Sequence, residues 1–363
     1  MSGAISFVGG GDPALTQVIV GASHIKKNFD TLTEQASSGY ISTTYDGLGG
    51  TAPTALALGP QISALTAAQA NISAASGPAQ ITQTTMTQIQ SIASGLMANM
   101  PNLNNLNSTE IDTISAQAQS DLTQVANLLD TQYGGVYVFA GQDSSNPPVP
   151  NPNQILSSGF FTQIQAAVST MSTNGAAATT AATLAVASSN ASGTSPFSSY
   201  MSQPSTSISP PSVSTGNGQS QTIGLMAGAN TNAVSTGTST TGSYMRDLMR
   251  ALATVGSLSS SQASDPNFAS VIADTQTSVT NMVTAMSTDV GVLGEQQANL
   301  TTMGTNMSDT STALTGQLTT AQNVDMATTL SDLSLTQTQL QASYQLLSAS
   351  SGMSLVKYLA AGA

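Results

Sequence analysis

The sequence of 363 residues is long enough for a sizeable core and for more than one domain. Only 6% of its residues are charged, and its formal net charge of −12 includes five basic residues. Nucleic acid and anionic membrane surfaces are therefore excluded as expected partners, because so few cations cannot neutralise them. The lack of cysteine excludes disulfides, thiolate metal ligands and a cysteine nucleophile.

The N-terminal part is predicted to form one amphipathic helix over residues 13–38. The start, MSGAISFVGGGDPALTQ, has neither a basic segment nor an apolar core, so no Sec signal peptide is predicted. Apolar residues then recur at steps of three and four, at Leu15, Val18, Ala22, Ile25, Phe29, Leu32 and Ala36. Ser37-Ser38-Gly39 ends this helix. Residues 40–60, rich in glycine and proline, are predicted to be loop.

A second helical section is predicted from residue 56 to residue 100. Gly77-Pro78 predicts a kink or break within it. Asn107 and Glu110 have capping-box spacing, which predicts that another helix begins there and runs until Gly134-Gly135. A short strand is predicted at residues 136–139. The apolar positions of the first section are Leu58, Ile62, Leu65, Ile72, Met86, Ile89, Ala93, Leu96 and Met100.

Residues 144–245 contain no Asp, Glu, Lys, Arg or His. One interpretation is a disordered linker, but disorder usually accompanies high net charge, so a small inserted domain is favoured. It is expected to contain a helix at 155–172 followed by strands and loops. Its core candidates are Ile155, Leu156, Phe160, Phe161, Ile164, Val168, Met171, Phe197, Tyr200, Ile223 and Leu225.

The C-terminal part is predicted to resume as helix at Tyr244 and to contain a long coiled-coil seam over residues 268–318. Such a helix would span roughly 75 Å. A last seam follows at Met326, Leu330, Leu333, Gln337, Leu340, Tyr344, Leu347 and Ser351. A helix of this kind at a chain end needs a partner, and the helix at 13–38 is the expected one.

The predicted fold class is mainly α: a long antiparallel helical rod with a terminal coiled coil and a small inserted α+β or β-rich outer domain. The expected segments are an N-terminal coiled-coil segment (1–40), the N-terminal part of the rod (41–143), the uncharged outer domain (144–243), the C-terminal part of the rod (244–318) and a C-terminal coiled-coil segment (319–363).

Residues for catalysis are scarce, and a non-enzymatic protein without cofactor or metal is expected. His24 is the only histidine, and it lies off the apolar seam beside two lysines. Glu110, Asp112, Asp121 and Asp130 are predicted to form a solvated helix face rather than an acid–base pair. The glycine runs follow no strand of a βαβ unit, so no phosphate site is predicted.

Four segments resemble bacterial flagellins and the related hook–filament junction protein. They are LTEQASSGYIS (32–42), GPQISALTAAQANISAA (59–75), YGGVYVFAGQDSSNPPV (133–149) and NVDMATTLSDLSLTQTQLQASYQLLSASSGMSLVKYL (323–359). The similarity covers about the first 145 and the last 120 residues, in the order of the family. One departure is the loop at 42–50, which carries a single charge where flagellins are rich in Arg, Lys and Asp.

The resemblance implies a structural subunit of the extracellular bacterial flagellum that self-assembles into a helical homopolymer for motility. It further implies neighbouring hook-junction and cap proteins, an export chaperone and the flagellar export apparatus as partners. Nucleic acid and membrane insertion are not expected, and the Ser and Thr residues of 144–245 could accept O-glycans. The expected assembly interface is Leu15, Val18, Ala22, Ile25, Phe29, Leu32, Leu330, Leu333, Leu340, Tyr344, Leu347 and Leu355.

Two other functions remain open at this point. The ending SGMSLVKYL resembles the junction protein as well as filament flagellins. A surface adhesin or glycan-binding flagellin homologue is the third hypothesis, and it requires a ligand groove in residues 144–245.

Overall fold

Helices make up 71% of the structure, a computed structural model that describes residues 13–104, 108–216, 218–230 and 232–360. The predicted mainly α fold is therefore confirmed. The chain divides into two compact units. Unit 1 comprises Met1–Ala64 with Asp309–Ala363, and unit 2 comprises Leu65–Ser308.

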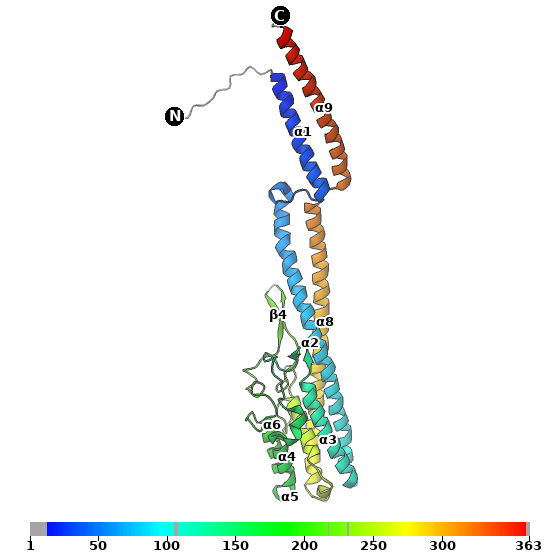
Figure 1. The fold of residues 1–363 in the computed structure, drawn as a ribbon. Helices are drawn as coiled ribbons and strands as arrows, with labels where there is room; N and C mark the ends of the chain where they lie inside the picture. Colours follow the sequence, from blue (N-terminus) through cyan, green and yellow to red (C-terminus); the bar gives the residue numbers. More distant parts are fainter. Residues whose placement is uncertain (1–12, 105–107, 217, 231, 361–363) are drawn as a thin grey trace, which may run out of the picture. The chain divides into compact units, whose positions relative to one another are not determined.

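In unit 1, helices α1 (Pro13–Ser38) and α9 (Met326–Ala360) pack side by side and run in opposite directions (Figure 1). The seam predicted at residues 13–38 forms the helix that was expected there. A short 3₁₀ helix, η1 (Asp46–Thr51), follows α1. The unit also holds the beginning of α2 (Ala52–Asn99) and the end of α8 (Phe268–Gln322).

Helix α2 begins before residue 56, the predicted start of this section, and ends within one residue of the predicted end at residue 100. The loop expected up to residue 60 is wrong after Thr51, because Pro53 lies in the first turn, where a helix needs no backbone donor. Of the kink or break expected at Gly77-Pro78, a break is wrong, since α2 is continuous to Asn99. A Cβ at residue 77 would collide with the hydroxyl end of the Tyr133 side chain, so glycine here makes room for that ring.

Unit 2 has one main hydrophobic core, to which α2, α3 (Ser108–Leu129), α7 (Tyr244–Gly256) and α8 contribute. The seam predicted along α8 is confirmed in this unit, where its apolar members are buried or half-buried. All thirteen residues of α7 are buried, including two arginines and an aspartate. The buried seam residues of α8 are Ile272, Val279, Met286, Leu293 and Leu300.

A small hairpin follows α3, formed by β1 (Gln132–Tyr133) and β2 (Val136–Tyr137). The prediction that Gly134-Gly135 ends the preceding helix is wrong, because α3 already ends at Leu129. The two glycines instead form the turn, with φ values of 59° and 86° that favour glycine. The strand predicted at 136–139 is shortened to β2. Asn107, the expected helix cap, lies outside the described residues.

The uncharged section contains more helix than predicted. The single helix expected at 155–172 is replaced by the 3₁₀ helix η3 (Pro152–Ser157), α4 (Gly159–Ser169) and α5 (Met171–Asn174). Helix α6 (Ala176–Ser188) was not predicted, and a second hairpin joins β3 (Ser212–Gly216) to β4 (Gln219–Thr222). Two further 3₁₀ helices are η2 (Met100–Asn104) and η4 (Ser260–Gln262).

The predicted core residues of this section are buried or half-buried, but most of them join the main core with α3 and α7. Phe160, Phe161, Ile164 and Val168 of α4 are buried there. Ile223 belongs instead to a smaller cluster with Ile72 of α2 and Leu300 of α8. The section therefore folds onto the helices of unit 2 rather than around a separate core.

Candidate assembly surface

The antiparallel pairing of α1 and α9 is fixed at one end by the connections to the neighbouring helices. Gly39, with φ of 77°, ends α1, and its carbonyl oxygen accepts a hydrogen bond of 3.0 Å from the Val324 N–H. The Ile41 N–H donates to the Gln322 carbonyl oxygen at 2.7 Å. Tyr40 and Asn323 form an antiparallel bridge between these contacts. The end of α1 and the start of α9 are thus held together by backbone hydrogen bonds.

The start of α9 is capped by Asp325. Its carboxylate accepts hydrogen bonds from the N–H groups of Ala327 at 2.9 Å and Thr328 at 3.3 Å. These bonds stabilise the ionised form, and they lower the pKa of Asp325 below its usual value. A carboxylate at this position satisfies donors that have no partner within the helix. Asp325 therefore determines where α9 begins.

The predicted seam of α1 is the face that packs against α9. Ala22 is buried, and Val18, Ile25, Phe29, Leu32 and Ala36 are half-buried, whereas most neighbouring residues of α1 are exposed. Leu15 of the predicted interface lies outside the described side chains. The three-and-four spacing therefore identified the packed face of α1 correctly.

On α9 the predicted seam is only half right. Leu333, Leu340 and Leu347 are half-buried, but the intervening positions Leu330, Gln337 and Tyr344 are exposed. Leu355, also predicted, lies outside the described side chains. The positions that alternate with the three leucines on the packed face are Thr329, Thr336 and Ser343, each one residue earlier than predicted.

Hydroxyl residues occupy these alternate positions because their polar groups can be satisfied inside α9. Thr329 Oγ1 donates to the Asp325 carbonyl oxygen, and Ser343 Oγ donates to that of Gln339, both at 2.8 Å. A hydroxyl bonded in this way can be partly buried without leaving an unpaired polar group. Leu330 and Tyr344 therefore remain about half exposed beside the packed face.

Large apolar side chains are consequently exposed along the hairpin. Leu330 is 52% exposed, Tyr344 50% and Leu346 63%. Exposed large apolar residues that gather on one surface indicate an interaction site, whereas scattered ones do not. The exposed large apolar residues of the hairpin, called here its apolar surface, flank the packed leucines of α9 on both sides rather than forming one continuous patch; they are Ile19, Val20, Met326, Leu330, Leu335, Tyr344 and Leu346.

Electrostatics contribute little to this surface. Lys26 Nζ lies 2.7 Å from Asp30 Oδ2 in an exposed ion pair, and this hydrogen bond raises the pKa of Lys26. His24 and Lys27 are exposed on α1, as predicted from their position off the seam. Exposed ion pairs stabilise proteins only weakly, so apolar burial is the main force that this surface can supply.

Of the four carboxylates predicted to form a solvated face, Glu110 and Asp112 are exposed, whereas Asp121 and Asp130 are half-buried. Asp112 Oδ1 accepts a hydrogen bond of 2.7 Å from the Ser260 N–H, and Asp130 Oδ1 accepts one of 2.9 Å from the Val149 N–H. Asp112 is nevertheless exposed, as predicted, whereas Asp130, just beyond the end of α3, is half-buried, so the solvated face is wrong for Asp130. Burial raises the pKa of Asp130 to about 6, and it also raises that of Asp121.

Two arginines of α7 hold the uncharged section in place. Arg246 donates to the carbonyl oxygens of Gly228 at 2.9 Å and Ala187 at 3.1 Å, and its guanidinium lies 5.0 Å from the centre of the Phe197 ring. Arg250 donates to the Ser239 carbonyl oxygen at 2.7 Å. Burial lowers the pKa of both side chains. The two arginines of α7 thus provide charged hydrogen-bond donors to residues 144–245, a section that has no charged side chains of its own.

Two aspartates interact with Arg250, and a third is bonded to Tyr244 of the same helix. Arg250 Nη1 lies 3.9 Å from Asp274 Oδ2. Asp247 accepts a hydrogen bond of 2.8 Å from the Thr241 N–H, and buried Asp289 accepts one of 2.8 Å from the Tyr244 hydroxyl. Burial and Asp289 together raise the pKa of Tyr244 well above its usual value. These contacts explain the role of α7 as a structural anchor, which periodicity alone did not reveal.

Among the described residues, no group of three or more His, Cys, Asp or Glu side chains could hold a metal ion. In the part of the chain that the structure describes, none of the helices combines the length and apolar character that a membrane crossing requires.

Comparison with known families gave two matches. The model of the bacterial flagellin N-terminal helical region matches residues 19–144. The model of the bacterial flagellin C-terminal helical region matches residues 276–359. Together they cover more than half of the chain and include most of both α1 and α9. A search of curated proteins gave no match.

Proposed function

The chain belongs to the bacterial flagellin family, and we propose that it is the subunit of a flagellar filament that assembles through its α1–α9 hairpin. Flagellins are structural proteins of the bacterial flagellum, and they polymerise into its extracellular filament. The proposed assembly interface comprises the predicted seam residues of both helices together with the apolar surface of the hairpin.

The observation that carries this proposal is the exposure of Leu330, Tyr344 and Leu346 on α9. Full burial of a leucine side chain stabilises by about 1.5–3 kcal/mol, and roughly half of that gain is still available at a half-exposed position. A neighbouring subunit that covers these side chains would realise the remainder. Assembly would therefore be stabilised by burial of apolar side chains that remain exposed in the isolated hairpin.

The five segments expected from the sequence take on proposed roles in this function. Residues 1–40 and 319–363 would form the inner coiled coil of the filament, and residues 41–143 and 244–318 would form the surrounding shell. Residues 144–243 would face solvent and present serine and threonine side chains for O-glycans. Hook-junction and cap proteins, an export chaperone and the export apparatus are the proposed partners.

Electron microscopy after seeding tests the proposal. Purified full-length protein would be mixed with sonicated fragments of its own polymer or with isolated hooks, and fibre lengths would be measured over time. A filament subunit elongates the seeds into long fibres. A hook–filament junction protein adds only a short segment, and that outcome would support the alternative role instead.

A further inference from the structure

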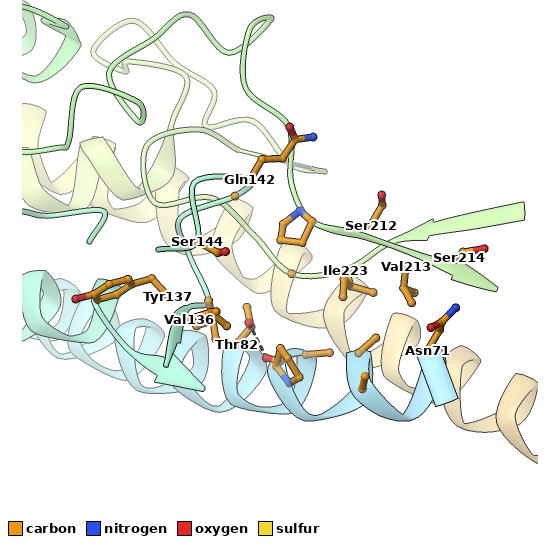
Figure 2. Close-up of a pocket in the computed structure, with 18 residues that line it drawn as sticks. Asn71, Thr82, Val136, Tyr137, Gln142, Ser144, Ser212, Val213, Ser214 and Ile223 are labelled. Atoms are coloured by element: carbon orange, nitrogen blue, oxygen red, sulfur yellow. Dashed lines mark hydrogen bonds between the residues drawn. The ribbon is translucent and has the colours of Figure 1, made fainter. Parts of the chain in front are cut away.

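An open pocket of about 700 Å³ lies in unit 2, outside the hairpin (Figure 2). Its floor is α2, from Asn71 to Thr82. One wall is formed by β2 and the residues that follow it, up to Ser144. The other wall is formed by residues 211–214 with Ile223 and Gly224. The volume lies within the range of small-ligand sites in proteins.

Both walls are fixed by backbone contacts. The Tyr137 N–H donates to the Ser144 carbonyl oxygen, and the Ile223 N–H donates to that of Pro211, each at 2.8 Å. Gly141 has φ of +63°, and a Cβ there would lie 2.9 Å from the Ser209 carbonyl oxygen. Glycine thus permits the close approach of the two walls. The pocket is therefore preformed, which lowers the entropic cost of binding a ligand.

The lining combines an apolar floor with a polar rim. Ala75, Ala79 and Ile223 are buried beneath the pocket. The side-chain amides and hydroxyls of the rim form no hydrogen bond with any residue that the structure describes, in contrast to Thr82, whose Oγ1 donates to the Pro78 carbonyl oxygen at 2.9 Å. These rim groups belong to Asn71, Gln142, Ser144, Ser212 and Ser214.

The charge of the lining limits the class of ligand. None of the described residues that line the pocket is Asp, Glu, Lys, Arg or His. An ionic ligand would lose hydration here without a charged partner to compensate for that loss. A neutral molecule with hydroxyl groups around an apolar face can pack on the apolar floor and form hydrogen bonds with the polar rim. We propose that this pocket binds a neutral saccharide free in solution, with the C–H face of a sugar ring on α2 and its hydroxyls bonded to the rim.

The test uses full-length protein and defined sugars. Lactose, maltose and cellobiose serve as neutral probes, and sialyllactose serves as the anionic comparison. Saturation-transfer NMR detects binding, and isothermal titration measures the dissociation constant. Ala74→Trp places a large ring in the pocket from an exposed position of α2, and Ala67→Trp places the same ring one heptad away, outside the lining. The double variant N71A/S212A removes two hydrogen-bonding groups of the rim.

We expect at least one neutral disaccharide to bind, with sialyllactose weaker. Ala74→Trp should weaken that binding by about tenfold or more, because the added ring occupies the pocket. A tenfold change in affinity corresponds to roughly 1.4 kcal/mol. N71A/S212A should also weaken it, whereas Ala67→Trp should leave it unchanged, and thermal melts would verify that all variants fold. The proposal is overturned if no neutral disaccharide binds, if sialyllactose binds more tightly, or if the two tryptophan variants behave alike.

Discussion

Truncation of exposed leucines on α9 should weaken assembly without unfolding the monomer. Leu330 and Leu346 are 52% and 63% exposed, so each has about 1 kcal/mol of burial free energy to gain from a neighbouring subunit. L330A/L346A removes about 2 kcal/mol of that gain per subunit. Since a change of 1.4 kcal/mol is tenfold in an equilibrium constant, the critical concentration for polymerisation should rise about 30-fold.

The assay is sedimentation of seeded polymer, with the monomer that remains in the supernatant measured as the critical concentration. Alanine keeps high helix propensity, so the thermal melt of the unpolymerised variant should match that of the wild type. The matched control is Q341A/Q345A, which removes two exposed polar side chains of the same helix that do not belong to the predicted seam. The reasoning is refuted if both double variants leave the critical concentration unchanged, or if both raise it equally.

Three further predictions concern the rest of the chain. Deletion of 324–363 should abolish polymerisation and leave the unfolding transition of unit 2 intact by circular dichroism; filaments formed by the truncated protein would contradict this. Asp130 has a folded pKa of about 6, above the unfolded value of 3.8, so its contribution is present below pH 3.8 and lost as the pH rises through 6. Unit 2 should therefore be about 1 kcal/mol more stable to urea at pH 4.5 than at pH 7.5, a value reduced from that of the full pKa shift because Asp130 is partly exposed. D130N should remove this pH dependence. The control E295Q, at an exposed site, should keep it. R250M should destabilise unit 2 by about 3 kcal/mol in urea, because it leaves aspartates without their cation, whereas K27M should change stability by less than about 0.5 kcal/mol; equal effects would disprove the anchoring role of α7.

Periodicity predicted the long helices well because their burial is set by packing on one face. The seams of α1 and α8 agree with the buried positions. On α9 the three-and-four spacing fits two overlapping helix faces, both of which contain Leu333, Leu340 and Leu347. The more apolar of the two was predicted to be the packed face, and that prediction is wrong. A sequence pattern cannot distinguish a leucine that packs within the chain from one that remains available to another subunit.

Local signals failed where tertiary contacts override them. Pro78 does not end α2, and the glycine before it makes room for the Tyr133 ring, which belongs to a hairpin distant in sequence. Helix α6 consists largely of alanine and threonine without a clear apolar period, so no helix was predicted there. The pocket between β2 and β3 joins residues about 75 positions apart, and no local pattern indicates that approach.

Thiol labelling tests the central claim that the α1–α9 hairpin is the assembly interface. The chain contains no cysteine, so Leu346→Cys provides a single reactive thiol on the apolar surface, and Ser192→Cys provides an exposed control in the uncharged section. The rate of labelling by a maleimide would be compared between monomer and polymer. Cys introduced at position 346 should react rapidly in the monomer and be strongly protected in the polymer, while the control reacts equally in both. Unchanged labelling at position 346 on polymerisation would contradict the account.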